Sequence, residues 1–385
     1  MIDPDQLIDQ ARADTGLDDF GDDTWLEGLD RLVEALASEA RLSELGEQIA
    51  AGDLLGHLVT RLQLTEWRRE HPEIVGQPVE PPIVLMGQGR TGTTILFDLL
   101  AQDPATRVPL TWEVDRPVPP PETATYLTDP RIEEVDAVLA GTNLLVPNFQ
   151  KMHPMGARLA QECVRITAPT FRSIIFGTTY RVPSYLTWTF DAADMAPAYR
   201  FHRAFLEHLQ SRHPAPRWVL KSPAHIWTLD ALLAEYPNAL LVQTHRDPLR
   251  IVASLATLVA TLRRLACDDP TIPEAAQDWT DALIDGLDRS IDAREQGVVK
   301  PEQVVDVHFA EFMSDPFATI GRIYSRLGLE LTSEAESRMR TFLASHPQEP
   351  GQRYTFADTG LDADELRERT RRYEEYFDVP REPIA

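Results

Sequence analysis

The stretch IVLMGQGRTGTTILFDLL, residues 83–100, limits the possible folds more than any other part of this 385-residue chain. Its four leading apolar residues follow a proline pair, as is typical of a short buried strand. The glycine-rich loop after them leads into a segment with helical periodicity. A strand, a glycine loop and a helix in this order can hold an anion at the helix N-terminus. The stretch therefore predicts a parallel sheet with a ligand site at its edge.

Three later segments also place a short apolar strand before a helix. These are RWVLKSPAH at 217–225, NALLVQTHRDP at 238–248, and QVVDVHFAEFMSDPFATIGRIYSRLGL at 303–329. Alternation of this kind indicates a parallel sheet with helices on both faces. We therefore predict an α/β protein with a P-loop-like three-layer fold and a central parallel sheet.

The domain organisation is predicted from the same periodicities. Apolar residues of the segment 1–80 recur at helical spacing without strand-like alternation, so this part should be a helical N-terminal extension. Residues 81–385 should form the α/β domain. An aromatic-rich segment at about 143–200 is expected as an insertion that lines or covers an acceptor pocket, although such residues more often form an ordinary core.

Composition excludes several classes of protein. The net charge of −24 argues against nucleic-acid binding, which depends on basic contacts to phosphates. No apolar run approaches the roughly 18 residues of a membrane span, so we do not expect an integral membrane protein. The start MIDPDQLIDQ lacks the apolar core of a signal peptide, which points to the cytoplasm. Cys163 and Cys267 are too few for a disulfide framework and are expected to be buried, reduced thiols. The oligomeric state is left open.

The glycine loop itself indicates the kind of anion that binds. A nucleotide-triphosphate loop places lysine where this chain has Thr93, and the only cation within the loop is Arg90. No aspartate suited to holding magnesium follows a predicted strand. We therefore expect a ligand with a short anionic chain and no metal ion. The residues predicted to hold it are Gly89, Arg90, Thr91, Gly92, Thr93 and Thr94.

Two further strands should deliver polar side chains to the same edge, because the carboxyl ends of parallel strands meet there. One strand is followed by Lys221 and His225, and the other by Arg246. Ser254 lies about two helical turns after Arg246 and shares a helix face with Arg250. Arg246 and Ser254 could together surround a phosphate monoester, although a plain surface ion pair of Arg246 is the simpler alternative.

The motifs GRTGTT and HRDPLRIVAS resemble the two cofactor signatures of sulfotransferases that use 3′-phosphoadenosine-5′-phosphosulfate (PAPS). The resemblance extends over about 82–331 and is closest to the bacterial branch of that superfamily. It implies that the 5′-phosphosulfate is bound by the motif residues Arg90, Thr91, Gly92, Thr93 and Thr94. It also implies that Arg246 and Ser254 bind the 3′-phosphate. Two residues of a late loop that could close over the same phosphate are Arg353 and Tyr354.

The resemblance also implies the reaction and its catalytic residues. PAPS and a hydroxylated small molecule or lipid would give a sulfate ester and adenosine 3′,5′-bisphosphate. Arg90, assisted by Lys221, would stabilise charge on the leaving phosphate. Two residues compete as the proton-accepting base, His225 and Glu113, since related enzymes place either a histidine or a glutamate near these positions.

The alternatives to this hypothesis come from two classes. One is a metal-dependent nucleotide kinase or ATPase, which Thr93 in the lysine position disfavours. The other is a nucleotide-binding protein without transfer activity. The sequence does not identify the acceptor.

Overall fold

The structure is a computed structural model that describes residues 2–145, 155–346 and 354–384. The chain divides into two compact units, and each unit is built from several separate segments of sequence. Unit 1 consists of Met1–Val79, Pro109–Ala215 and Thr261–Pro270, and unit 2 consists of Glu80–Val108, Pro216–Ala260 and Thr271–Ala385.

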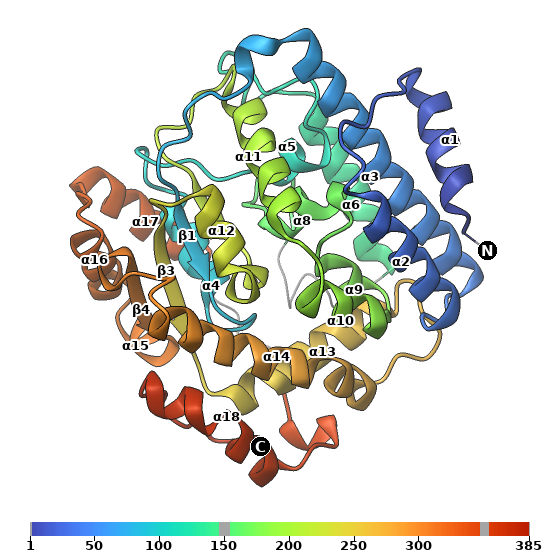
Figure 1. Ribbon diagram of the computed structural model, residues 1–385. Helices are drawn as coiled ribbons and strands as arrows, with labels where there is room; N and C mark the ends of the chain where they lie inside the picture. The colour runs from blue at the N-terminus through green and yellow to red at the C-terminus, as the bar shows by residue number, and fades with distance from the viewer. Residues whose placement is uncertain (1, 146–154, 347–353, 385) are drawn as a thin grey trace. The chain divides into compact units, whose positions relative to one another are not determined.

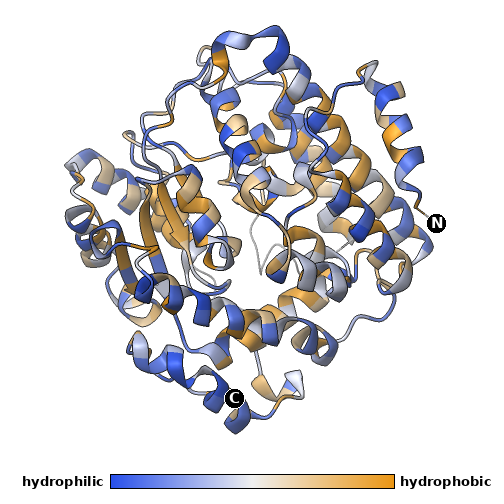
Figure 2. Cartoon of the chain, viewed as in Figure 1, coloured by the Kyte–Doolittle hydropathy of each residue, from blue (hydrophilic) through white to orange (hydrophobic). Residues whose placement is uncertain are grey.

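Unit 2 contains a sheet of four parallel strands in the order β2-β1-β3-β4. The strands are β1 (Ile83–Met86), β2 (Val219–Lys221), β3 (Leu240–His245) and β4 (Val304–His308). Each strand lies in one of the four segments that the sequence predicts. Figure 1 draws the sheet as short arrows, and Figure 2 shows these arrows mostly in the colour of hydrophobic residues. The prediction of an α/β fold with a central parallel sheet is confirmed.

The register of the sheet brings the strand ends together. Leu85 pairs with Lys221, Met86 pairs with Gln243, and His245 at the end of β3 pairs with His308. All residues of β1 are buried, which explains why this strand has no polar positions. The polar residues that follow β1, β2 and β3 therefore emerge along one edge of the sheet.

Helices contact both edge strands of the sheet. The helix α4 contacts β1 and β2, while α15 and α16 contact β4. The longer α14 packs against α18 and the 3-10 helix η3. The helical elements of unit 2 are α4 (Thr93–Leu100), η3 (Pro223–Trp227), α12 (Leu229–Glu235), α13 (Pro248–Arg263), α14 (Ile272–Glu295), η4 (Pro301–Gln303), α15 (Phe309–Ser314), α16 (Pro316–Arg326), α17 (Ser333–Ser345), η5 (Phe356–Thr359) and α18 (Ala363–Tyr376). The end of α13, from Thr261, is assigned to unit 1.

Unit 1 is helical in its described part. It contains α1 (Pro4–Thr15), α2 (Leu26–Ser38), α3 (Glu44–Glu70), η1 (Pro72–Ile74), α5 (Thr111–Asp115), α6 (Arg131–Leu145), α8 (Cys163–Thr167), η2 (Ala168–Thr170), α9 (Ile175–Thr179), α10 (Pro183–Asp191) and α11 (Ala196–Gln210). The core of unit 1 joins α1–α3 to the aromatic segment. Phe171, Phe176 and Tyr185 are buried in this core beside Trp25 and Leu29.

The burial of these aromatic side chains agrees with the simpler interpretation of the segment as core. The placement of an acceptor-binding insertion at about 143–200 stays a prediction, as do the domain boundaries at 80 and 81. Both cysteines are free thiols and are buried. Among the described residues, no helix is both long and apolar enough to cross a membrane.

Two helical elements follow the strands that end with predicted site residues. After β2 the chain forms the short 3-10 helix η3, and Ser222 caps it by accepting a hydrogen bond from the Ala224 N–H at 3.0 Å. Proline at the first position suits this start. After β3, the helix α13 begins at Pro248 and ends at Arg263.

Gly87 provides a stability test of the loop entry. Its φ is 129°, and a Cβ atom there would lie 2.6 Å from both the carbonyl oxygen and the Oγ1 of Thr244. We expect Gly87→Ala to lower the free energy of unfolding by about 2–4 kcal/mol, because it adds backbone strain and a clash with β3. Urea denaturation measures the change. Gly89→Ala is the control, since its Cβ would meet nothing within 4 Å; equal stability of the two variants would contradict the tight approach of loop and β3.

Candidate functional site

The glycine loop turns sharply between β1 and α4. Gly87, Arg90 and Gly92 all have positive φ, at 129°, 73° and 86°. Arg90 is a non-glycine residue in this sparsely populated region, and strain of this kind concentrates at functional sites. Gly92 is the N-cap of α4, so the first amides of the helix point toward the loop. The loop thus has the backbone shape of an anion-binding site.

Thr91 has a structural role within the loop. Its side chain is buried, its Oγ1 donates to the Gln88 carbonyl at 2.7 Å, and it shares a 2.5 Å hydrogen bond with the Thr244 hydroxyl. These bonds fasten the loop to β3. Of the loop hydroxyls, Thr93 and Thr94 at the start of α4 are therefore the better candidates to meet a ligand.

The side chain of Arg90 connects the loop to two other predicted site residues. Its Nε donates to Ser254 Oγ at 2.9 Å, and its Nη2 donates to the Tyr354 hydroxyl at 3.1 Å. The guanidinium also lies 5.7 Å from the centre of the Tyr354 ring. Three residues predicted from separate parts of the sequence thus lie in direct contact. Arg353 falls outside the described residues.

Arg246 lies beside the loop at the end of β3. Its Nη1 donates to the Arg90 carbonyl at 2.9 Å, and its guanidinium stacks on the Phe309 ring at 3.9 Å. Phe309 also lies near Gly92, where an added Cβ would approach its ring to 3.0 Å. Arg246 therefore supports the loop backbone in addition to offering a charge. Its remaining donors form an ion pair with Glu382, at 2.8 Å and 3.0 Å.

Lys221 and the start of α4 form the other side of the loop. The Lys221 side chain is buried, and its Nζ donates to Thr94 Oγ1 at 3.3 Å. Asp98 lies one helical turn after Thr94, on the same face of α4. Burial raises the pKa of Asp98 to about 6, and the positive charges of Lys221 and His346 oppose this rise. The sequence alone does not single out Asp98, because an aspartate within an apolar helix has no motif.

The two predicted bases have different surroundings. His225 is buried on η3, in unit 2, and follows the strand that ends with Lys221. Glu113 is fully buried on α5, in unit 1. Its Oε2 accepts hydrogen bonds from the Leu110 N–H at 2.8 Å and the Tyr126 hydroxyl at 3.1 Å. These bonds give Glu113 a structural role at the start of α5.

Some residues that contact the predicted site were not found from the sequence. Phe309, Thr244 and Glu382 contact the predicted residues but belong to no motif. Phe309 and Thr244 could have been suspected, since each lies at or next to the end of a predicted strand. Glu382 had no signal, because it lies among many charged residues after α18.

An α/β fold with a glycine loop, a helix N-terminus and arginines in the loop and directly after β3 defines a P-loop-like protein, for which the sequence predicts an anionic ligand. Comparison with known proteins narrows this class. The sequence pattern of the sulfotransferase family matches residues 81–333, and the chain belongs to that family.

Two solved structures are similar to this chain over nearly its whole length. Sulfotransferase STF9 from Mycobacterium avium is 31% identical, with a TM-score of 0.91 over 99% of this chain and 98% of that one. Sulfotransferase STF1 from Mycobacterium tuberculosis H37Rv is 33% identical, with a TM-score of 0.85 over 96% of this chain and 98% of that one. A further relative is the omega-hydroxy-beta-dihydromenaquinone-9 sulfotransferase Stf3 of Mycobacterium bovis. It is 26% identical in an alignment of 274 positions that covers 69% of this chain and 68% of that protein.

Asp98 predicts a pH dependence of stability. Its pKa is raised to about 6 in the folded protein, so the unfolded chain loses this proton at lower pH than the folded one. The contribution of Asp98 to stability is therefore complete below about pH 4 and is lost as pH rises to about 6. We expect Asp98→Asn to be more stable than the wild type by about 1–3 kcal/mol at pH 7.5, with a smaller gain at pH 4.5.

Urea denaturation at several pH values measures this difference. Asp230→Asn, at an exposed position on α12, controls for the loss of one carboxylate. A gain in stability of Asp98→Asn that is the same at pH 4.5 and pH 7.5 would show that burial does not raise the pKa of Asp98.

Proposed function

We propose that this chain is a cytoplasmic enzyme that transfers the sulfuryl group of PAPS to a hydroxyl group of a small-molecule or lipid acceptor, without a metal ion. The main support for this proposal is the direct contact between the glycine loop and the segment after β3, the two predicted anion-binding elements of unit 2. Arg90 Nε lies 2.9 Å from Ser254 Oγ, and Arg246 Nη1 lies 2.9 Å from the Arg90 carbonyl. A nucleotide with two separate anionic groups suits such neighbouring sites, because each group meets an arginine of its own.

The residues fit the two ends of this cofactor. The N-terminal amides of α4, with Thr93 and Thr94, would hold the phosphosulfate, as helix N-termini hold anions. Arg246 and Ser254 would hold the 3′-phosphate, and Tyr354 lies at the same end. Arg353 is proposed as a further contact by resemblance alone. When bound, PAPS supplies the sulfuryl group that is transferred.

The chain itself must orient the acceptor, remove its proton and stabilise negative charge on the leaving phosphate. Arg90 is the proposed source of that charge stabilisation. Its guanidinium must then exchange the Ser254 and Tyr354 hydroxyls for ligand oxygens. Lys221 is within hydrogen-bonding distance of Thr94, 3.3 Å, and adds a second positive charge at the start of α4.

Both His225 and Glu113 stay candidates for the proton-accepting base. We prefer His225, because it follows the same strand as Lys221 and belongs to unit 2, as the glycine loop does. Glu113 already accepts hydrogen bonds from Leu110 and Tyr126, which accounts for its burial without a role in catalysis.

A lipid alcohol is the first acceptor to test. The relative Stf3 is named for sulfation of a hydroxylated dihydromenaquinone, and this chain shares 26% identity with it. A nucleotide kinase is the competing hypothesis. It has less support, because Thr93 replaces the lysine that triphosphate loops place on the β- and γ-phosphates.

Transfer of label from PAPS tests the proposal. We expect radiolabelled sulfur to appear in an ester when the protein is incubated with PAPS and a panel of phenols, sterols and isoprenoid alcohols. Arg90→Ala should reduce turnover by about 10²–10³-fold and change cofactor affinity less, because the charge it stabilises develops in the transition state. Phosphate transfer from magnesium ATP, with no transfer from PAPS, would support the kinase instead.

The base is identified by a second comparison. His225→Ala should lower turnover by about 10²–10⁴-fold, and the loss should shrink for acidic phenols that are already partly ionised. Glu113→Gln keeps the size of the side chain and is the matched variant. A large, acceptor-dependent loss in Glu113→Gln, with an active His225→Ala, would assign the base to Glu113.

A further inference from the structure

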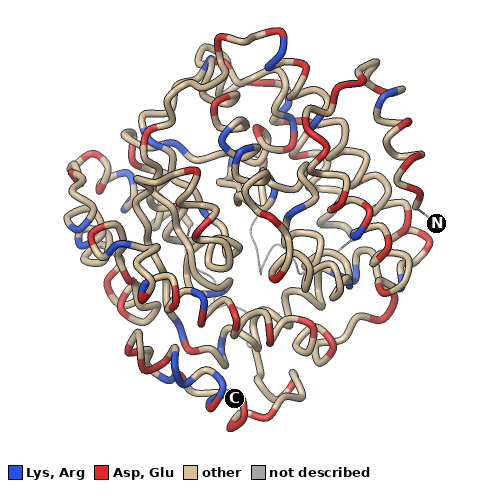
Figure 3. The backbone as a smooth tube through the Cα atoms, in the orientation of Figure 1, with Lys and Arg blue, Asp and Glu red and all other residues tan. Residues whose placement is uncertain are grey.

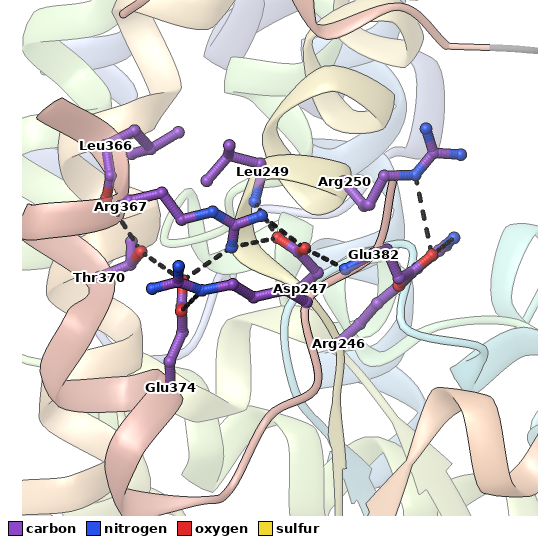
Figure 4. Close-up of polar contacts among 10 residues, drawn as sticks. Arg246, Asp247, Leu249, Arg250, Leu366, Arg367, Thr370, Glu374 and Glu382 are labelled. Carbon is purple, nitrogen blue, oxygen red and sulfur yellow. Dashed lines mark hydrogen bonds and ion pairs between the residues drawn. The ribbon is translucent and has the colours of Figure 1, made fainter. Parts of the chain in front are cut away.

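The segment at 378–384 returns from α18 to the end of β3 (Figure 4). The segment leaves α18 through Asp378, whose φ is 51°, and Val379 is buried. The Val379 N–H donates to the Glu374 carbonyl at 2.9 Å, and Arg381 Nε donates to Glu374 Oε2 at 2.9 Å. These contacts fix the conformation of the segment. Figure 3 shows that acidic and basic residues both lie close together in this part of the chain.

The backbone at position 382 is fixed by a buried carboxylate. Asp247 is 1% exposed, and its Oδ2 accepts a hydrogen bond from the Glu382 N–H at 2.6 Å. The same carboxylate accepts both Nη groups of Arg367, at 2.8 Å and 2.7 Å. Asp247 directly follows Arg246 in sequence. The anchor thus holds Glu382 beside the arginine that we assign to the 3′-phosphate.

The Glu382 carboxylate takes the outer face of the Arg246 fork. Its Oε1 accepts from Nε at 2.8 Å and its Oε2 accepts from Nη2 at 3.0 Å, which is a bidentate pair. Arg250 Nε lies 3.8 Å from the same Oε2. Two oxygens of a phosphate monoester bind an arginine fork with the same geometry. The carboxylate and a phosphate therefore compete for one pair of donors.

We propose that Glu382 is an internal competitor of the cofactor's 3′-phosphate, an inference that rests on the proposed function. Binding of the phosphate requires the Glu382 side chain to leave Arg246 and Arg250, since two anions cannot share the fork. The backbone bond to Asp247 does not involve this carboxylate, so a change of side-chain rotamer is sufficient. The competition weakens binding of every nucleotide that carries a 3′-phosphate and speeds release of the bisphosphate product.

Calorimetry with two nucleotides tests this inference. Adenosine 3′,5′-bisphosphate carries the 3′-phosphate and adenosine 5′-monophosphate lacks it. If the paired form of Glu382 predominates about tenfold in the wild type, Glu382→Ala should bind the bisphosphate about tenfold more tightly. Binding of the monophosphate should stay the same. Glu382→Gln, which removes the charge and keeps the shape of the side chain, should also bind the bisphosphate more tightly than the wild type does.

Glu375→Ala is the matched control, because Glu375 is an exposed glutamate of α18. Bisphosphate affinity in Glu382→Ala that is equal to or weaker than that of the wild type would overturn the competition, and the cofactor assignment would stand if the wild type still prefers the bisphosphate. If neither the wild type nor Glu382→Ala prefers the bisphosphate to the monophosphate, both the competition and the assignment of Arg246 are wrong.

Discussion

A buried carboxylate requires hydrogen-bond donors on both of its oxygens, and Asp247 obtains them from three parts of unit 2. The Leu249 N–H at the start of α13, the Arg367 guanidinium of α18 and the Glu382 N–H all donate to it. Because Asp247 follows β3 directly, these bonds join α13, α18 and the segment after α18 to the end of the sheet where Arg246 and the glycine loop meet. Loss of this carboxylate would remove a bidentate partner of Arg367, although Glu374 would still accept a hydrogen bond from it, and would free the backbone at Glu382. We therefore regard Asp247 as the support of the candidate site.

The strands and the glycine loop could be predicted because their physics is local. Four apolar residues before a glycine loop leave few alternatives to a buried parallel strand. The meeting of Arg90, Arg246 and Ser254 follows from the same argument, since parallel strands end at one edge. Lys221 near Thr94 follows likewise. The choice between His225 and Glu113 as base could not be predicted in this way, because position at a strand end does not determine which group accepts a proton.

The rest depends on contacts between residues far apart in sequence. The burial of Glu113 comes from Tyr126 and from the start of its own helix, and no motif announces it. The pKa of Asp98 depends on how α4, Lys221 and α17 pack around it. Glu382 pairs with an arginine 136 residues away. A single sequence carries such pairings only as ordinary charged residues, whose partners are decided by packing.

The charge of the chain gives the pairing of Glu382 and Arg246 a wider meaning. Acidic residues outnumber basic ones in this chain, 61 to 37, so an arginine of the candidate site readily meets a carboxylate, and Arg246 meets Glu382. A half-buried arginine without a partner would lose hydration and would be less ordered. The Glu382 carboxylate instead holds the guanidinium of Arg246 in one geometry, the geometry of a bidentate pair. In the proposed exchange of that carboxylate for a phosphate, Arg246 keeps an anion as its partner throughout. The pairing would thus order Arg246 at the expense of affinity, which agrees with the release of a bisphosphate product after every turnover under the proposed function.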